Sequence, residues 1–277
     1  MTRSRLQVLT VFTMLSVIAP IGLLPAHSVA TSALMVRPDS AVVRNEGGFV
    51  PVEYHRSSLP SVYVAANAMY LPAAITMMYP GPAVNPVEQR TVRISSLRTA
   101  LRGLYAAAKA PTGGWGTPNV ADAPATTVSV TVDGRTRTVS VYALGIGSGP
   151  GVSTKQQQAR TKLLSAIRKL ESLKGASSMY RPLKLEAWPS SAHTTVKNPE
   201  GSSPLPGTNP GDEPIINPYG PDLPWFTSTM PEGCTVVDAA ALPQDANQAT
   251  TWVAGGDRFT VTFRVVLPGE IPCGKRR

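Results

Sequence analysis

Histidine, the usual general base of nucleophilic catalysis, occurs only three times in this chain of 277 residues. His55 and His193, the two that follow the N-terminal apolar segment, both lie among turn-forming residues. A serine or cysteine nucleophile needs a base within hydrogen-bonding reach and a third group that orients the base. Neither histidine lies in a motif of that kind, so we expect no serine or cysteine hydrolase and assign no catalytic residue.

Carboxylates offer a second kind of chemistry, because a pair of them can cleave a glycosidic bond without a histidine. Asp133 belongs to an Asp-Gly turn, and Asp122 closes the loop before a predicted strand, so turn formation explains both. A carboxylate-dependent extracellular hydrolase nevertheless stays an alternative function, because the chain offers several carboxylates that could form such a pair. Its candidate residues are Glu46, Glu53, Asp122, Asp133 and Glu186.

The glycine-rich segment Gly145–Gly151 lies between a predicted strand and a predicted helix, where a phosphate-binding loop would lie. Pro150 replaces the third glycine of a dinucleotide fingerprint, and no lysine follows at P-loop spacing. Around Ser148, Ile146 and Pro150 replace the glycines of a nucleophile elbow. We predict a connecting loop and no cofactor.

Soft metal ligation is a third possibility, since Met69, Met77 and Met78 could join His55 around a copper ion. Adjacent residues of a strand point to opposite faces, so Met77 and Met78 would not share one ion. We expect the methionines to fill the core and predict no metal site.

The first thirty residues are typical of a secretory signal peptide. Arg3 and Arg5 precede an apolar stretch over residues 6–24, and small residues at 28–30 form a cleavage site. We expect cleavage to leave no transmembrane segment, and the mature protein to be secreted, either free or associated with the cell envelope.

Cys234 and Cys273, the two cysteines of the chain, both lie in its last quarter. Cysteines of an exported protein tend to pair, whereas no histidine follows Cys234 at a zinc-site spacing. The sequence therefore predicts a structural disulfide.

The formal net charge of +9 favours an anionic partner outside the cell, such as a wall polymer, lipid headgroups or an acidic glycan. The basic residues are dispersed and do not alternate with aromatic ones, so we expect no nucleic-acid binding.

Short apolar runs separated by turn residues predict a meander of strands over residues 41–75, including one at Phe49–Tyr54, and a further strand at 87–94. Apolar residues at helical spacing from Leu97 to Ala108 predict a helix behind a Ser95 or Ser96 cap.

Asp133-Gly134 joins two alternating segments, 127–132 and 136–142, and predicts a β-hairpin with a type I′ turn. A second amphipathic helix is expected from Thr154 to Lys174, with a capping box formed by Thr154 and Gln157, and Gly175 is placed to end it. Its apolar stripe should face the sheet and its basic side should face solvent. The candidate contacts to an anionic polymer are Arg160, Lys162, Arg168 and Lys169.

The remaining chain is predicted to be β-rich, with a strand at 183–188 that could return to the first sheet and strands at 235–237, 250–253 and 259–266. The fold class we predict is α+β: an antiparallel sheet with two amphipathic helices, plus a small disulfide-closed C-terminal region. The expected parts are a signal peptide (1–30), an α+β domain (31–188), a Pro/Ser-rich linker or surface excursion (189–224) and the C-terminal region (225–277).

Several phrases of the sequence resemble a group of uncharacterised secreted proteins and lipoproteins of actinobacteria. The phrases are GGFVP (47–51), LP (59–60), YPGPA (79–83), ADAPATT (121–127), VDGRT (132–136), VYAL (141–144), FR (263–264) and LPGE (267–270). The chain departs from the group in having no lipid-modified cysteine, and in having Ala66-Asn67-Ala68 where relatives carry a Gly-Asp-Gly turn. The resemblance implies export but no activity, so it assigns no functional residue.

The function we expect is that of an exported non-enzymatic protein that binds anionic cell-envelope material or an envelope protein. The hydrolase above is one alternative. A protein-binding module that uses the edges of its sheets is another.

Overall fold

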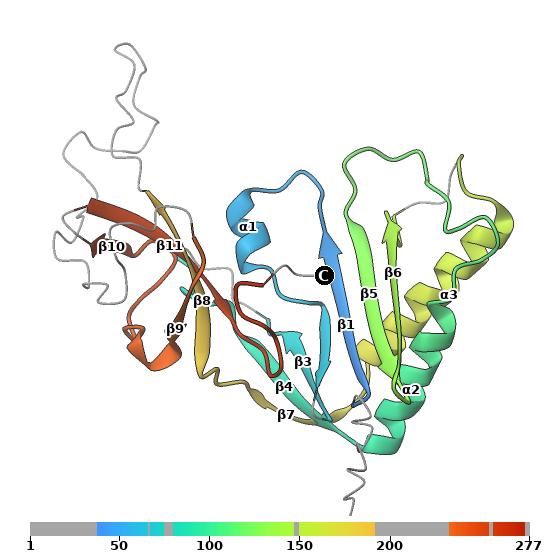
Figure 1. Cartoon of the computed structure of the whole chain (residues 1–277), viewed down its shortest axis with the longest axis horizontal. Coiled ribbons are helices and arrows are strands. Elements are labelled where there is room, and N and C mark those ends of the chain that lie inside the picture. The colour runs from blue at the N-terminus through green and yellow to red at the C-terminus, as the bar shows by residue number, and fades with distance from the viewer. Residues whose placement is uncertain are drawn as a thin grey trace, which may run out of the picture. The chain divides into compact units, whose positions relative to one another are not determined.

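The computed structural model describes residues 38–65, 67–74, 80–146, 150–191, 233–254 and 257–274. The predicted signal peptide and most of the predicted linker lie outside these ranges. The described chain has the predicted α+β fold: a seven-stranded antiparallel sheet with two main helices, followed by a four-stranded C-terminal sheet (Figure 1).

The larger sheet has the strand order β6-β5-β1-β2-β3-β4-β7, and every neighbouring pair is antiparallel. The predicted hairpin is confirmed, since Asp133 and Gly134 both have positive φ, as a type I′ turn requires. The strands are β1 (Ser40–Glu46), β2 (Val62–Ala65), β3 (Ala68–Pro72), β4 (Val87–Val92), β5 (Ala125–Val132), β6 (Arg135–Tyr142) and β7 (Gly175–Met179).

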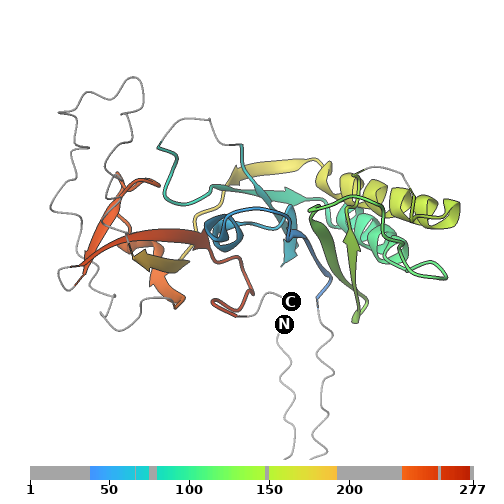
Figure 2. The same ribbon diagram turned by 90° about the horizontal axis from the view of Figure 1, so that it is seen from above.

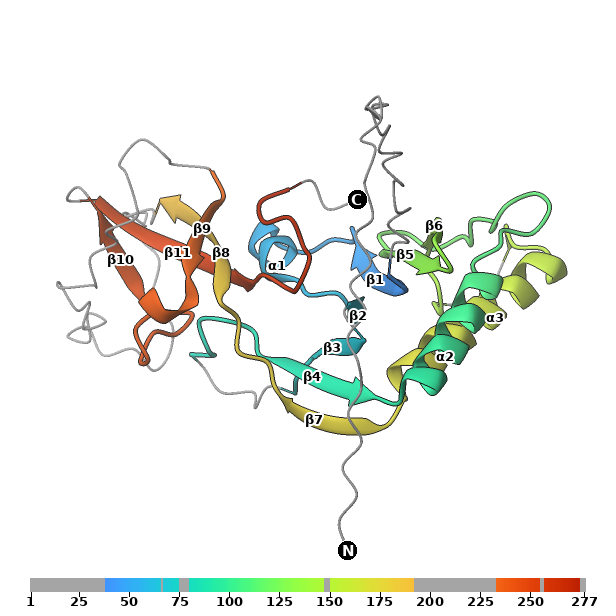
Figure 3. The ribbon, with the colours of Figure 1, turned by 60° about the horizontal axis from the view of Figure 1, so that its bottom comes forward.

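Two helices, α2 (Ile94–Ala107) and α3 (Thr154–Glu171), cover one face of this sheet (Figures 2 and 3). They run antiparallel, because Val92, just before α2, pairs with Gly175, which follows α3. Their apolar stripes pack against the valines of the central strands. The helix side of this core is formed by Leu97, Ala100, Leu101, Leu104, Leu163, Ile167 and Leu170.

The ends of both helices differ from the prediction. Helix α2 starts at Ile94 without a side-chain cap, so the predicted serine cap is wrong. The capping box of α3 is formed by Ser153 and Gln156, one residue earlier than expected. Gly175 does not end α3 but starts β7, where a Cβ atom would lie 2.1 Å from the carbonyl oxygen of Thr91. Close packing against β4 therefore explains this glycine.

The strand predicted at Phe49–Tyr54 is also wrong, because residues Val52–Ser57 form the short helix α1. Gly47 and Gly48 both have positive φ and end β1 just before this segment. None of the α1 residues is buried, so the apolar residues of this segment are not held in a sheet.

The C-terminal sheet has the order β10-β11-β8-β9. Strand β8 pairs with β11 and β9 and does not return to the larger sheet, contrary to one expectation. Its residues Leu185 and Ala187 join a second core, in which Phe263 packs near Tyr63 and Tyr70 of the larger sheet. The elements are β8 (Lys184–Ser191), β9 (Thr235–Asp238), a 3-10 turn (Ala239–Ala241), β10 (Thr251–Ala254) and β11 (Asp257–Val265).

Candidate functional site

Helix α3 presents a straight row of exposed cations. Lys155, Lys162 and Lys169 follow one another at intervals of seven residues, so they lie on one side of the helix, about 10.5 Å apart along its axis. No carboxylate in the described ranges forms an ion pair with any of the three. We call these three residues the α3 lysine row.

Of the four predicted polymer contacts, Lys162, Arg168 and Lys169 are exposed, whereas Arg160 is 2% exposed. The Arg160 guanidinium donates to the carbonyl oxygens of Tyr142 and Ala143, at 2.8 and 2.6 Å, and its burial lowers its pKa. Arg160 falls on the buried stripe of α3, which a count of charges along the helix does not reveal. Arg160 is thus a structural contact between α3 and the end of β6, and the expectation that it lies on the solvent-facing side of the helix is wrong.

Helix α2 adds further cations, but they are partly neutralised. Arg98 lies 3.6 Å from Asp39, and Arg102 lies 3.5 Å from Asp133. The arginine of each pair is well exposed, so water and salt screen these interactions. The α3 lysine row is therefore the less compensated part of the basic surface.

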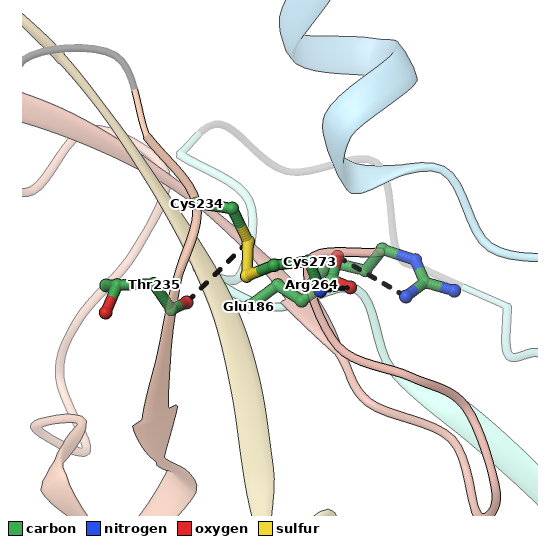
Figure 4. Close-up of a disulfide and its surroundings, with 5 residues drawn as sticks. All are labelled: Glu186, Cys234, Thr235, Arg264 and Cys273. Carbon is green, nitrogen blue, oxygen red and sulfur yellow. Dashed lines mark hydrogen bonds and ion pairs between the residues drawn. A yellow bond between two sulfur atoms is a disulfide. The ribbon is translucent and has the colours of Figure 1, made fainter. Parts of the chain in front are cut away.

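A buried charge cluster lies in the C-terminal region, centred on Arg264 (Figure 4). Its Nη2 donates to both carboxylate oxygens of Glu270, at 2.8 and 3.0 Å. Its Nη1 lies 3.5 Å from Glu186, and its Nε donates to the carbonyl oxygen of Ser58 at 3.1 Å. The same Glu186 carboxylate accepts the backbone N–H of Cys273 at 3.0 Å, beside the disulfide. The cluster thus joins β8 and β11 to the segment that follows β11, residues 267–273, which we call the C-terminal turn.

Two residues of the larger sheet extend this cluster. Arg44 donates to Glu270 at 2.7 Å, and the Tyr63 hydroxyl donates to the carbonyl oxygen of Pro268 at 2.8 Å. Burial, together with the charge of Glu270, raises the pKa of Tyr63 to about 12. Burial alone would raise the pKa of Glu270, but hydrogen bonds from Arg264 and Leu267 and the charge of Arg44 hold it below its ordinary value.

These contacts bear on the carboxylate chemistry considered above. The structure brings the candidate Glu186 near a second carboxylate, Glu270, with Arg264 between them. A glycosidase acid must hold a proton near neutral pH, which requires a raised pKa. Glu270 has a lowered pKa and is ion-paired, so this arrangement favours a structural role over a proton donor.

The other candidates are dispersed. Glu46 accepts a hydrogen bond from Thr127, Asp133 lies beside Arg102 in the hairpin turn, and Asp122 has positive φ in a loop. Glu53 lies on α1. These positions explain why residue type alone did not identify a paired site.

Sequence reasoning missed Arg264 and Glu270 as a pair. The available signal was a single charged residue, Arg264, within the otherwise apolar run Phe263–Val266. A charge at such a position is buried and needs a partner. The partner could not be named, because Glu270 approaches through a turn whose path the local sequence does not specify.

Two cavities flank α1. His55 lines one of about 230 Å³ together with Arg44, Glu46 and Ser58. The Nε of Arg44 is buried and has no hydrogen-bond partner in the described part of the chain. The second cavity, of about 320 Å³, lies between α1 and β11. His193 lies outside the described residues.

The predicted disulfide is confirmed: Cys234 and Cys273 are bonded, with their Cα atoms 5.5 Å apart. Met69 is buried in the core, as expected, while Met77 and Met78 lie outside the described residues. Within the described ranges, no group of three or more histidine, cysteine or acidic residues is placed to hold a metal ion. A search of the same residues found no helix long and apolar enough to cross a membrane.

The described chain is thus a disulfide-bonded α+β protein with a basic helical surface. Comparison with known proteins gave no match among family models, curated proteins or solved structures.

Proposed function

We propose that this chain is an exported, non-catalytic protein that binds anionic cell-envelope material through the α3 lysine row. The observation that carries the proposal is the regular line of Lys155, Lys162 and Lys169, exposed and without ion-pair partners in the described chain. The Cys234–Cys273 disulfide, the signal-like N-terminus and the resemblance to secreted actinobacterial proteins support export.

A linear polyanion suits this surface better than a compact anion. Cations about 10.5 Å apart cannot converge on one phosphate or carboxylate, but they can contact successive charges of an extended chain. Exposed contacts of this kind are screened by salt, so binding should weaken steeply as ionic strength rises.

The test compares purified residues 31–277 with the variant Lys155→Gln/Lys162→Gln/Lys169→Gln in binding to isolated envelope fractions over a salt series. Each cation near an anionic surface contributes on the order of 1 kcal/mol, so the triple variant should bind about tenfold more weakly or worse at low salt. The matched control, Arg93→Gln/Arg135→Gln/Arg181→Gln, removes the same charge from exposed positions elsewhere.

The control variant should bind nearly as the original protein does. If the triple lysine variant binds as tightly as this control, the effect is one of net charge and the proposal for α3 fails. If the original protein does not bind envelope material at low salt, the proposed function as a whole fails.

A second candidate function is protein binding at a sheet edge, favoured by β7. This strand lies at the end of the larger sheet, and all five of its residues are exposed. An extended segment of a partner could add to such an edge through backbone hydrogen bonds. A partner that is lost on Ser177→Pro and kept by the triple lysine variant would favour this function over the first.

A further inference from the structure

The cavity between α1 and β11 is lined by side chains that form hydrogen bonds but carry little charge. Figure 1 shows α1 beside β11, and the space between them measures about 320 Å³. The lining side chains that bear on the argument are Glu53, Tyr54, Ser57, Asn85, Gln248 and Thr262. They come from four separate parts of the chain, and we call this cavity the α1–β11 groove.

Specific contacts hold these separate parts together. The backbone N–H of Gln248 donates to the carbonyl oxygen of Gly81 at 2.9 Å, and Asn247 forms a β-bridge with Pro82. The Asn85 side chain donates to the carbonyl oxygen of Ser57 at 3.4 Å, linking this loop to α1. The groove is therefore a defined site of the fold and not a gap between unconnected loops.

Gly81 has a specific part in this arrangement. A Cβ atom at this position would lie 2.9 Å from Oε1 of Gln248, closer than side chains normally approach. Glycine thus allows the Gln248 amide to lie against the loop at the edge of the groove.

The donors and acceptors of the groove suit a ligand with many hydroxyl groups. The Asn85 and Gln248 amides and the Thr262 hydroxyl each supply both a donor and an acceptor, as a hydroxyl ligand requires. Glu53 adds an acceptor. Among the residues that the structure describes, those that line the groove include no lysine or arginine, so it is a poor site for a phosphate or carboxylate.

Two further features add to this chemistry. Tyr54 is 60% exposed, so its ring can offer an apolar surface beside the polar groups. Strand β10 pairs with β11 only as far as Thr260, so the edge of β11 from Val261 onward can offer backbone donors and acceptors to the groove.

We propose that the α1–β11 groove binds one unit of a neutral saccharide. A sugar ring combines hydroxyls that both donate and accept with C–H faces that can cover a tyrosine ring, and the groove is near the lower end of the usual size of a small-ligand site. This site is separate from the α3 lysine row and does not depend on the function proposed for that row. A short extended peptide, held by the edge of β11, is the competing occupant.

The experiment titrates the isotopically labelled protein, residues 31–277, with neutral disaccharides (diacetylchitobiose, cellobiose and maltose) at millimolar concentration. Binding is followed by NMR shifts of the Asn85 and Gln248 side-chain amides. At least one disaccharide should shift these signals. In Gln248→Ala the affinity should fall about tenfold, because one hydrogen-bonding amide is lost.

Two further variants make the test specific. Gly81→Ala leaves every polar group in place but displaces the Gln248 side chain, so it should also weaken binding. Gln158→Ala, which removes an exposed glutamine of α3, should leave the affinity unchanged. The proposal is overturned if none of the disaccharides shifts the groove signals, if Gln248→Ala binds as the original protein does, or if a peptide shifts them where sugars do not.

Discussion

Arg264 holds Glu270 through two hydrogen bonds from one nitrogen, Nη2, at 2.8 Å to Oε1 and 3.0 Å to Oε2. Arg264 belongs to β11, and Glu270 lies in the turn that follows it. Because Arg44 of β1 also donates to Glu270, and Ser58 accepts from Arg264, the pair joins the C-terminal turn to the larger sheet. The cluster therefore fixes the two sheets to one another around α1.

Replacing Arg264 by methionine should destabilise the protein strongly. The variant leaves the buried Glu186 and the largely buried Glu270 without their main cation, and loss of one partner of a buried pair costs about 3 to 5 kcal/mol. Urea unfolding followed by circular dichroism measures the change. Arg102→Met is the control, since its exposed pair with Asp133 should contribute less than about 1 kcal/mol. Equal losses in the two variants would contradict a special role for the buried cluster.

Glu270 should make stability depend on pH in the acid range. Its pKa in the folded protein lies below the ordinary value of 4.5, so the ionised form stabilises the fold above that value. The stabilisation is lost as the pH falls through the lower, folded pKa. The Glu270→Gln variant should therefore have a lower thermal unfolding midpoint than the original protein at neutral pH. Its midpoint should also fall less steeply as the pH is lowered into the acid range. If the midpoint of the variant falls with pH as steeply as that of the original protein, groups other than Glu270 dominate the acid dependence of stability.

The parts of the fold that the sequence predicted best are those set by local rules. Alternating residues around Asp133-Gly134 specify the hairpin, and apolar spacing specifies the buried stripes of α2 and α3. The pairing of Cys234 with Cys273 was predicted from the expected export of the chain and from the absence of other cysteines in the sequence.

The errors arise where tertiary contacts decide. The error at Phe49–Tyr54 is an exception, because it has a local cause: Gly47 and Gly48, which directly precede this segment, have positive φ and end β1. Strand β8 pairs with β11 because Leu185 and Ala187 complete a core built partly by residues from the larger sheet. The residues around β8 and Arg264 do not indicate which distant residues they contact. The assignment of β8 to the C-terminal sheet and the partners of Arg264 were therefore not predictable from the sequence.

Arg160 and Lys162 should behave as opposites, although both are basic residues of α3. Arg160→Met leaves the carbonyl oxygens of Tyr142 and Ala143 without a charged donor, and such bonds contribute about 1.5 to 3 kcal/mol each. Urea unfolding should show a large loss of stability for Arg160→Met and almost none for Lys162→Met. Envelope binding by Lys162→Met should weaken at low salt. A stable Arg160→Met protein with weakened binding would instead restore Arg160 to the binding surface.

The disulfide should contribute stability that reducing agents remove. Cys234 and Cys273 are 39 residues apart in the sequence, and closing a loop of that length stabilises by about 4 kcal/mol in the chain-entropy model. We expect dithiothreitol to lower the urea midpoint of the original protein toward that of Cys234→Ser/Cys273→Ser. The serine variant is its own control, since dithiothreitol should leave it unchanged. If reduction does not move the midpoint of the original protein, the contacts of Arg264 and Glu186 suffice to hold the C-terminal turn without the bond.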